Sequence, residues 1–313
     1  MPTAPTRRWW PWAVAGVLVL ALIAGSAILV SGLVAARSFV AHRSARPALT
    51  PADSGLAYSV IPLRARDGTD LEGWWIPPRD GARRRDLAVV VLAHGEDELG
   101  KASMLRHAGY LHRAGFILLL IDFRSYGGSK GDERTGGFLE QQDIAAAVRL
   151  AHERAVGAPV CVLGEGTGSL ASFLAVAQDP SIVALVSDSS PVSLEAELGR
   201  AAARGSFAPA LVPVVALGVE RIVGRGLVVE EVSALRAAPL AANRPIMVIA
   251  GAKDDRVPLS DTRALLRAIG PANATWSWVE PNTGHTEVFD QHPSEYAERV
   301  AQFLDAACSK PRR

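Results

Sequence analysis

The segment PVCVLGEGTGSLASFLAVA, residues 159–177, is the most informative part of the sequence about the fold. Its first five residues form an apolar run of strand length, GEGTG at 164–168 is a glycine-rich turn, and residues 169–177 are typical of a helix. An apolar strand that leads directly into a helix is characteristic of a parallel sheet covered on both faces. The segment therefore predicts an α/β fold with a tight strand-to-helix turn at residues 164–168.

The same alternation of strands and helices continues on both sides of this segment. A turn at Asp67 and Gly68 joins the first two predicted strands as an antiparallel pair. We expect a mostly parallel, doubly wound sheet with helices on both faces, and ligands beyond the carboxyl ends of its strands. The predicted strands are residues 58–63, 71–76, 87–93, 116–121, 159–163, 182–187, 246–250 and 275–279, and further helices are 105–114, 139–154 and 293–307.

Three loops that follow predicted strands carry residues suited to catalysis. HGE at 94–96 follows one strand, GAKDDRVP at 251–258 follows another, and GHT at 284–286 follows the last. An acid and then a histidine, each beyond a parallel strand, is the chain order of the acid and base in a hydrolase triad.

With these motifs the sequence resembles the α/β-hydrolase superfamily, especially its membrane-anchored, peptidase- and esterase-like branch. The resemblance spans roughly residues 58–307 and includes DFRSYGGS at 122–129, similar to the family's D-x-R-G-x-G-x-S, and Asp143. It implies that Asp254 is the triad acid, which holds the imidazole tautomer, and that His285 is the base. Asp255 is a neighbouring competitor for the acid role.

The turn at residues 164–168 departs from the family pattern. The family has G-x-S-x-G, in which the serine is the nucleophile at the apex of a sharp turn. Here Gly164 and Gly168 are kept, but Gly166 occupies the nucleophile position and has no side chain. Glycine tolerates the strained backbone of such a turn, so we expect the turn to form without its nucleophile.

The oxyanion hole needs only backbone N–H groups. By the family pattern these belong to Thr167, the residue after the nucleophile position, and to Glu96. A carboxylate at Glu96 is unusual beside a developing negative charge unless its side chain points away.

Four nearby residues are candidates to replace the serine: Thr167, Ser169, Glu165 and Cys161. Thr167 and Glu165 should point away from the apex, Ser169 should cap the helix, and Cys161 should be buried in the strand. A water deprotonated by His285 is a further route, because serine proteases without a triad member retain roughly a thousandfold catalysis over water.

The glycines also permit a dinucleotide-binding interpretation, with Gly164, Gly166 and Ser169 at a strand-to-helix turn and Asp188 about twenty residues on. That turn normally follows the first strand of its fold, whereas several strands precede it here. The interpretation would also leave the histidine and aspartate motifs unexplained, so we do not favour it.

The insert at about residues 191–240 resembles a family lid. Its apolar stretch, residues 207–223, is interpreted either as a pocket wall or membrane-resting surface, or as helices packed on the core. The loop at 188–191 is expected to line the cleft.

The N-terminal region contains an uncharged, mostly apolar run over residues 13–36. At about 1.5 Å per residue a helix of this length crosses a hydrocarbon core of about 30 Å. Basic residues flank both ends, so the positive-inside rule leaves the orientation open. A cleaved signal peptide is the alternative, but the run exceeds a signal core of about 7–15 residues. We expect an uncleaved, single-pass signal-anchor with the folded domain outside the cytoplasm.

Composition narrows the remaining function classes. The 313 residues carry a formal net charge of +1 and no broad basic patch, so no nucleic-acid partner is expected. The seven histidines show no zinc spacing, and neither a metal nor a cofactor is predicted. Cys161 in a strand and Cys308 in a polar tail do not suggest a disulfide framework.

The expected organisation is a basic and aromatic flank over residues 1–12, the transmembrane segment over 13–36, and a linker over 37–55. The hydrolase-fold domain follows over 56–307, and a tail over 308–313. The sequence favours a pseudoenzyme that binds an ester-like or lipidic ligand, or a protein partner of unknown identity. The alternative is an active or weakly active esterase- or peptidase-like hydrolase that uses water activated by His285 or a displaced hydroxyl.

Overall fold

The computed structural model describes residues 10–79 and 88–308, and its centre is an eight-stranded sheet with strand order β1-β2-β4-β3-β5-β6-β7-β8. The hairpin β1–β2 is antiparallel, as is the pairing of β2 with β4, and all other neighbours are parallel. The strands are β1 Ser59–Arg64, β2 Asp70–Ile76, β3 Val89–Ala93, β4 Ile117–Ile121, β5 Val160–Glu165, β6 Ile182–Asp188, β7 Ile246–Gly251 and β8 Trp278–Glu280.

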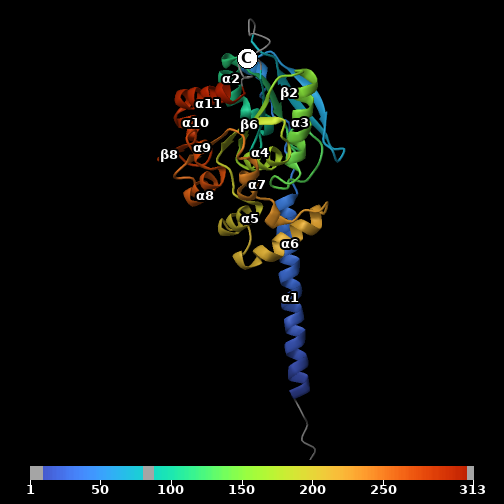
Figure 1. The fold of residues 1–313 in the computed structure, drawn as a ribbon. Helices are drawn as coiled ribbons and strands as arrows, with labels where there is room; N and C mark the ends of the chain where they lie inside the picture. The colour runs from blue at the N-terminus through green and yellow to red at the C-terminus, as the bar shows by residue number, and fades with distance from the viewer. Residues whose placement is uncertain (1–9, 80–87, 309–313) are drawn as a thin grey trace, which may run out of the picture.

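Helices cover both faces of this sheet (Figure 1). One face packs against α2 and α11, and the other packs against α3, α4, α7 and α8. This arrangement confirms the predicted α/β class and mostly parallel sheet. The helices of this domain are α2 Leu105–Ala114, α3 Glu140–Arg154, α4 Thr167–Gln178, α5 Leu194–Ala203, α6 Val212–Val223, α7 Ala234–Ala241, α8 Leu259–Ile269, α9 Pro271–Ala274, α10 Val288–Gln291 and α11 Pro293–Cys308.

The central strands are buried on both faces, which explains their unbroken apolar sequences. Every residue of β3, β4, β5 and β7 is buried. Side chains alternate across the sheet, so each such strand contributes to both apolar layers.

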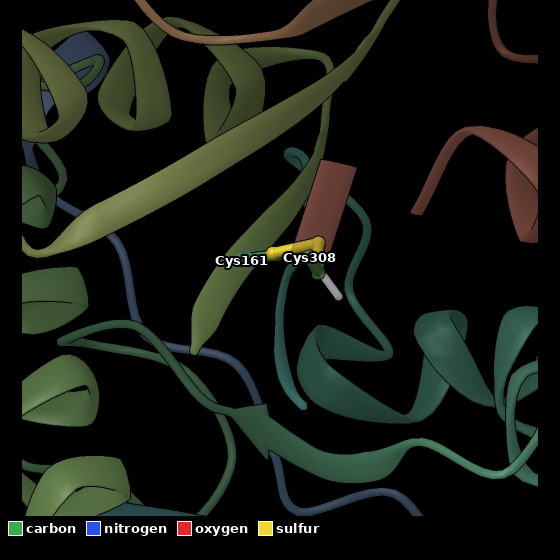
Figure 2. Close-up of a disulfide and its surroundings, with 2 residues drawn as sticks. All are labelled: Cys161 and Cys308. Carbon is green, nitrogen blue, oxygen red and sulfur yellow. A yellow bond between two sulfur atoms is a disulfide. The ribbon is translucent and has the colours of Figure 1, made fainter. Parts of the chain in front are cut away.

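A disulfide between Cys161 of β5 and Cys308, the last residue of α11, ties the sheet to the C-terminal helix (Figure 2). The two cysteines did not suggest a disulfide in the sequence, and the structure corrects that interpretation. They lie 147 residues apart in sequence, but α11 returns across the sheet and brings their Cα atoms to 6.5 Å. Cys308 therefore belongs to a helix and not to a tail. Residues 309–313 of the predicted tail and 1–9 of the predicted flank lie outside the described residues.

Helix α1, Trp10–Val40, projects from one end of the domain (Figure 1). It is long and apolar enough to cross a membrane, with a mean hydropathy of 2.7 over a window of which nothing is buried. It starts before and ends after the predicted span 13–36, so residues 37–40 of the predicted linker are helical. After the helix, the backbone of residues 41–44 bonds to the loop that follows β4.

The last turns of α1 pack against α6 of the insert. A Cβ added to Gly32 would lie 2.4 Å from Cγ1 of Val214, and one added to Gly218 would lie 2.7 Å from Cβ of Ala36. These glycines allow close approach of the two helices. The apolar stretch 207–223 thus packs on α1, and α5 and α6 lie on the side of the domain from which α1 projects (Figure 1).

Candidate active site

The turn between β5 and α4 has the geometry predicted for residues 164–168. Gly166 stands at the apex with φ of 52° and ψ of −125°, a conformation that L-residues with a side chain rarely adopt. A Cβ on Gly164 would lie 2.7 Å from the Gly168 carbonyl oxygen, and a Cβ on Gly168 would lie 2.2 Å from the carbonyl oxygen of His94. Both flanking positions therefore require glycine for close approach of strand, helix and the β3 loop.

His285 and Asp254 form a hydrogen-bonded pair beyond β7 and β8. The imidazole Nδ1 lies 2.8 Å from Asp254 Oδ2. The other carboxylate oxygen accepts from the backbone N–H groups of Arg256, at 2.8 Å, and Val257, at 2.7 Å. With its side chain fully buried and both oxygens bonded, Asp254 fixes the imidazole orientation, whereas Asp255 is exposed.

The free edge of the imidazole faces the apex of the β5–α4 turn. Nε2 of His285 would lie 3.6 Å from a Cβ placed on Gly166. Across the described ranges, Nε2 has no hydrogen-bond partner. The imidazole of His285 therefore lies between Asp254 and the apex at Gly166, as the base of a triad lies between the acid and the nucleophile.

The loop after β3 lies against the same turn. A Cβ on Gly95 would lie 3.3 Å from the carbonyl oxygen of Glu165 and 3.8 Å from Cα of Gly166. The next residue, Glu96, and Thr167 both line the cleft beside the apex, and the backbone N–H of neither bonds within the described part of the chain. His94 itself is buried, and its Nε2 accepts the backbone N–H of Phe123 at 3.0 Å, which holds the loop on β4.

Three of the four candidate replacements for the serine are occupied elsewhere. The hydroxyl of Ser169 bonds to Ser187 at 2.7 Å in the buried interior, and Cys161 is in the disulfide. The Glu165 carboxylate is bonded to Arg106 and His107 in a mostly buried cluster. Thr167 is half-buried and forms no side-chain hydrogen bond to a described residue.

The cluster around Glu165 was not identified from the sequence. Its Oε1 lies 2.6 Å from Arg106 Nη2 and 2.6 Å from His107 Nε2, both on α2. Burial raises the pKa of Glu165, but His107 and Arg106 outweigh burial and hold the pKa at about 2. The charged Glu165 carboxylate thus ties the turn to α2. The only sequence signal was a charged residue beside the apex of the predicted turn.

The loop that carries His285 is held on both sides of Thr286. The backbone N–H of Thr286 donates to Ser189 Oγ at 3.0 Å, and its carbonyl accepts from Arg106 Nη1 at 3.4 Å. Ser189 donates in turn to Asp188, which also accepts from Tyr296 at 2.9 Å. Burial and the nearby Glu165 raise the pKa of Asp188 to about 6. These contacts connect the imidazole loop to β6, α2 and α11.

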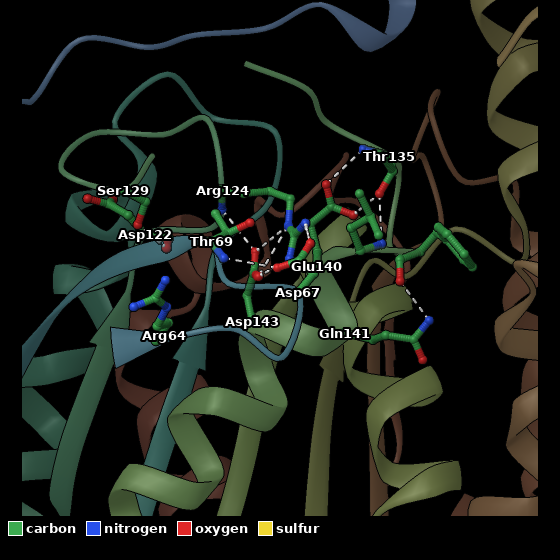
Figure 3. A network of polar contacts seen from close by, with 12 residues as sticks. Arg64, Asp67, Thr69, Asp122, Arg124, Ser129, Thr135, Glu140, Gln141 and Asp143 are labelled. Carbon is green, nitrogen blue, oxygen red and sulfur yellow. Dashed lines mark hydrogen bonds and ion pairs between the residues drawn. The ribbon is translucent and has the colours of Figure 1, made fainter. Parts of the chain in front are cut away.

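The motif at 122–129 is structural. Arg124, 2% exposed, donates to both oxygens of buried Asp143 and, at 2.7 Å, to Asp67 in the β1–β2 turn (Figure 3). Buried Lys101 pairs with Asp122 and, at 3.0 Å, with Glu72. These ion pairs hold the loop after β4 beside the hairpin and away from the cleft.

The cleft above the apex has a volume of about 700 Å³, within the range of small-molecule sites. Within residues 10–79 and 88–308, no cluster of three or more His, Cys, Asp and Glu side chains is arranged to hold a metal ion. The cleft is lined by Gly95, Glu96, Asp97, Ser103, Arg106, Glu165, Gly166, Thr167, Pro191, Glu197, Arg204, Lys253, Asp255, Arg256, Asn282, Gly284, His285, Thr286 and Glu287.

Solved structures with the same architecture include an esterase, an α/β hydrolase and a peptidase. The esterase Pf2001 of Pyrococcus furiosus superposes with a TM-score of 0.67 at 21% identity, over 86% of this chain and 100% of that one. The fold is that of the α/β hydrolases. The α/β hydrolase GrgF of Penicillium sp. sh18 gives 0.64 at 15% identity over 81% of this chain and 99% of that one. The acylaminoacyl peptidase of Pyrococcus horikoshii gives 0.58 at 16% identity, over 82% of this chain and 43% of that one.

Sequence relatives are uncharacterized proteins of bacteria. The chain is 30% identical to protein YfhR of Escherichia coli O157:H7 over 121 residues, 37% of this chain and 40% of that protein. The match thus spans less than half of that relative. The chain is 28% identical to protein MT2364 of Mycobacterium tuberculosis over 285 residues, 86% of this chain and 88% of that protein. No model of a known protein family matches the sequence.

Proposed function

We propose that the chain is a membrane-anchored pseudoenzyme of α/β-hydrolase fold that binds an ester-like or lipidic ligand without forming an acyl-enzyme. Asp254 and His285 stand in the positions of the triad acid and base, Gly166 stands in that of the nucleophile, and the N–H groups of Glu96 and Thr167 form the oxyanion site. The proposal rests mainly on one distance: His285 Nε2 lies 3.6 Å from the point where a Cβ of residue 166 would stand. A serine at that position would place its hydroxyl within reach of the imidazole, whereas glycine offers no oxygen to attack with.

A ligand can still be bound because the recognition groups do not depend on residue 166. The unbonded N–H groups of Glu96 and Thr167 are suited to bind a carbonyl or acyl oxygen of the ligand. The cleft provides both charged and neutral side chains around them. The esterase and peptidase structures with the same fold support an ester or amide group as the recognised chemistry.

A weak hydrolase is the second candidate, favoured by the unpartnered Nε2 of His285. A water beside Gly166 would give its proton to Nε2, and the resulting hydroxide would attack the ester carbonyl. The N–H groups of Glu96 and Thr167 would stabilise the tetrahedral oxyanion, which would collapse as the leaving alkoxide takes the proton from His285. Turnover of a p-nitrophenyl ester that is lost in His285→Ala would support this route.

We propose a single-pass membrane location with the folded domain outside the cytoplasm. Helix α1 supports the anchor, since its apolar window is wholly unburied within the protein. The Cys161–Cys308 disulfide supports the orientation, because structural disulfides persist in oxidising compartments and are rare in the cytosol.

The proposal is tested by treating the wild-type chain with a fluorophosphonate, which reacts covalently with activated serine nucleophiles. We expect no stoichiometric adduct by intact mass, because His285 has no hydroxyl to activate. A stoichiometric adduct that disappears in His285→Ala would show that another residue serves as nucleophile and would overturn the proposal.

A further inference from the structure

A second cavity, of about 650 Å³, lies between α1 and the insert. Its walls come from the last turns of α1, from α5 and from the segment that precedes α6. It is lined by Val30, Ser31, Val34, Ala35, Ser38, Phe39, Glu96, Arg134, Glu197, Ala201, Arg204, Ser206, Phe207, Ala208 and Leu211.

The lining of this cavity changes character along its length. The end formed by Val30, Val34 and Leu211 is apolar. The lining also includes the charged side chains of Glu96, Glu197, Arg134 and Arg204. Arg134 donates to the carbonyl oxygen of Phe39 at 3.0 Å, which places it near the last residues of α1 and away from Val30. A cavity that is apolar at one end and charged at the other matches an amphiphile and not a uniformly polar ligand.

The charged end is shared with the catalytic-type cleft. Glu96, Glu197 and Arg204 line both cavities, so the two spaces meet at these side chains. Burial raises the pKa of Glu96 at this junction. A ligand whose apolar part fills the second cavity would therefore present its polar end beside Glu96 and the His285 cleft.

The apolar end lies at the level of a membrane boundary. About 20 helical residues cross a hydrocarbon core of about 30 Å. Counted from Trp12, which is 82% exposed and suited to one interface, that length ends near Gly32. Val30 and Val34 flank this level and are each 60% exposed. When α1 spans a bilayer, Val30 and Val34 at this end of the cavity would lie where lipid acyl chains meet their ester groups.

We propose that this cavity binds one acyl chain of a bilayer lipid, which enters sideways between α1 and residues 206–211. The ester end of the lipid then reaches Glu96 and the cleft that holds His285. The inference rests on the proposed function in taking that cleft as the ligand site, and it adds the ligand class, a long-chain acyl ester, and its route from the bilayer.

The test uses the full chain in phospholipid nanodiscs with a long-chain acyl ester that carries a photoreactive diazirine within its chain. We expect cross-links concentrated on residues 30–39 and 201–211. Val34→Trp should reduce them by about tenfold, because a blocked mouth loses the burial of several methylenes. Ala208→Trp should act in the same direction from the opposite wall.

Two matched variants separate the cavity from general lipid contact. Ile23→Trp changes a residue of α1 that is equally exposed, at 60%, but does not line the cavity. Ala210→Trp changes an exposed neighbour of Ala208 outside the cavity. Both should keep wild-type cross-linking. Cross-links spread evenly along α1, or an equal effect of Val34→Trp and Ile23→Trp, would overturn the inference.

A second readout distinguishes this inference from the proposed function. In a Gly166→Ser background, Val34→Trp should slow hydrolysis of a palmitoyl ester in vesicles by about tenfold and leave a soluble butyryl ester unchanged. No hydrolysis of either ester in Gly166→Ser would count against the proposed function, while the cross-linking pattern would still decide the lipid cavity. Equal slowing of both esters would contradict the acyl-chain role.

Discussion

The imidazole of His285 faces the backbone of Gly166, with Nε2 3.6 Å from the point where a Cβ would stand. On its other side the ring is fixed by Asp254 at 2.8 Å. The loop that carries His285 is held by hydrogen bonds to Ser189 and Arg106. His285 and Asp254 are thus held in fixed positions, and residue 166 offers the imidazole no side chain to act on. The proposed function rests on this arrangement.

Asp254, and not Asp255, should support the imidazole. In a Gly166→Ser background, Asp254→Asn should lower kcat for a short p-nitrophenyl ester by roughly 10³–10⁴-fold, because the histidine loses the partner that fixes its tautomer. Asp255→Asn, which changes an exposed neighbour, should stay within a few-fold of its parent. Equal losses in the two variants would contradict the assignment of the acid.

The disulfide should contribute measurably to stability. Cys308→Ser should lower the free energy of unfolding by about 2–4 kcal/mol, because the cross-link restricts a long loop in the unfolded chain. Chemical denaturation with and without reductant measures it, and reductant should affect the wild type but not the variant. Thiol titration of the denatured, unreduced wild type should find no free thiol, and two free thiols would show that the bond is absent.

The Arg124–Asp143 pair should be needed for folding of the sheet edge. Arg124→Met should cost about 3–5 kcal/mol, because buried Asp143 loses its cation and hydrogen-bond donors and must either stay charged without a partner or take up a proton. Arg64→Met removes the exposed pair with Asp70 and should cost less than about 1 kcal/mol. Urea denaturation of both variants provides the comparison, and similar losses would argue against a structural role for the buried pair.

Asp188 should make stability depend on pH. Burial and Glu165 raise its pKa to about 6, so between roughly pH 4 and 6 the folded chain binds more protons than the unfolded chain. The free energy of unfolding of the wild type should therefore fall, relative to Asp188→Asn, by on the order of 2–3 kcal/mol as pH rises from 4 to 7. The contribution of Glu165, whose pKa is lowered to about 2, is lost as pH falls from about 5 towards 2 in both proteins, so the comparison with Asp188→Asn removes it. Parallel stability profiles of the two proteins would refute the shift.

Local sequence patterns were sufficient for most of the fold. Strands such as Ile117–Ile121 read as continuous apolar runs because both of their faces are buried. The glycines of the β5–α4 turn predicted a tight turn, and the structure shows that close approach there leaves no room for a side chain at Gly164 or Gly168. Chain order indicated an acid and a histidine beyond parallel strands, and the resemblance to the α/β hydrolases implied that Asp254 pairs with His285, with Asp255 left as a competitor.

The remaining features depend on contacts between distant segments. Cys161 and Cys308 meet because α11 folds back over β5, which no local pattern encodes. The bonds of Glu165 to Arg106 and His107 likewise depend on how α2 packs beneath the turn. The cavity beside α1 arises from contact between the N-terminal helix and an insert about 170 residues later, so neither segment alone predicts it.

Placing a hydroxyl at residue 166 is the most direct test that this residue occupies the nucleophile position beside His285. Gly166→Ser, measured with p-nitrophenyl butyrate, should raise hydrolysis at least about a hundredfold over the wild type, because the proposed acid, base and oxyanion groups surround the apex. The serine must adopt a positive φ, so a stability loss of about 1–3 kcal/mol should accompany the gain. Gly166→Ala should show the same stability loss with no gain of activity. A folded Gly166→Ser protein that remains as inactive as the wild type would contradict the account.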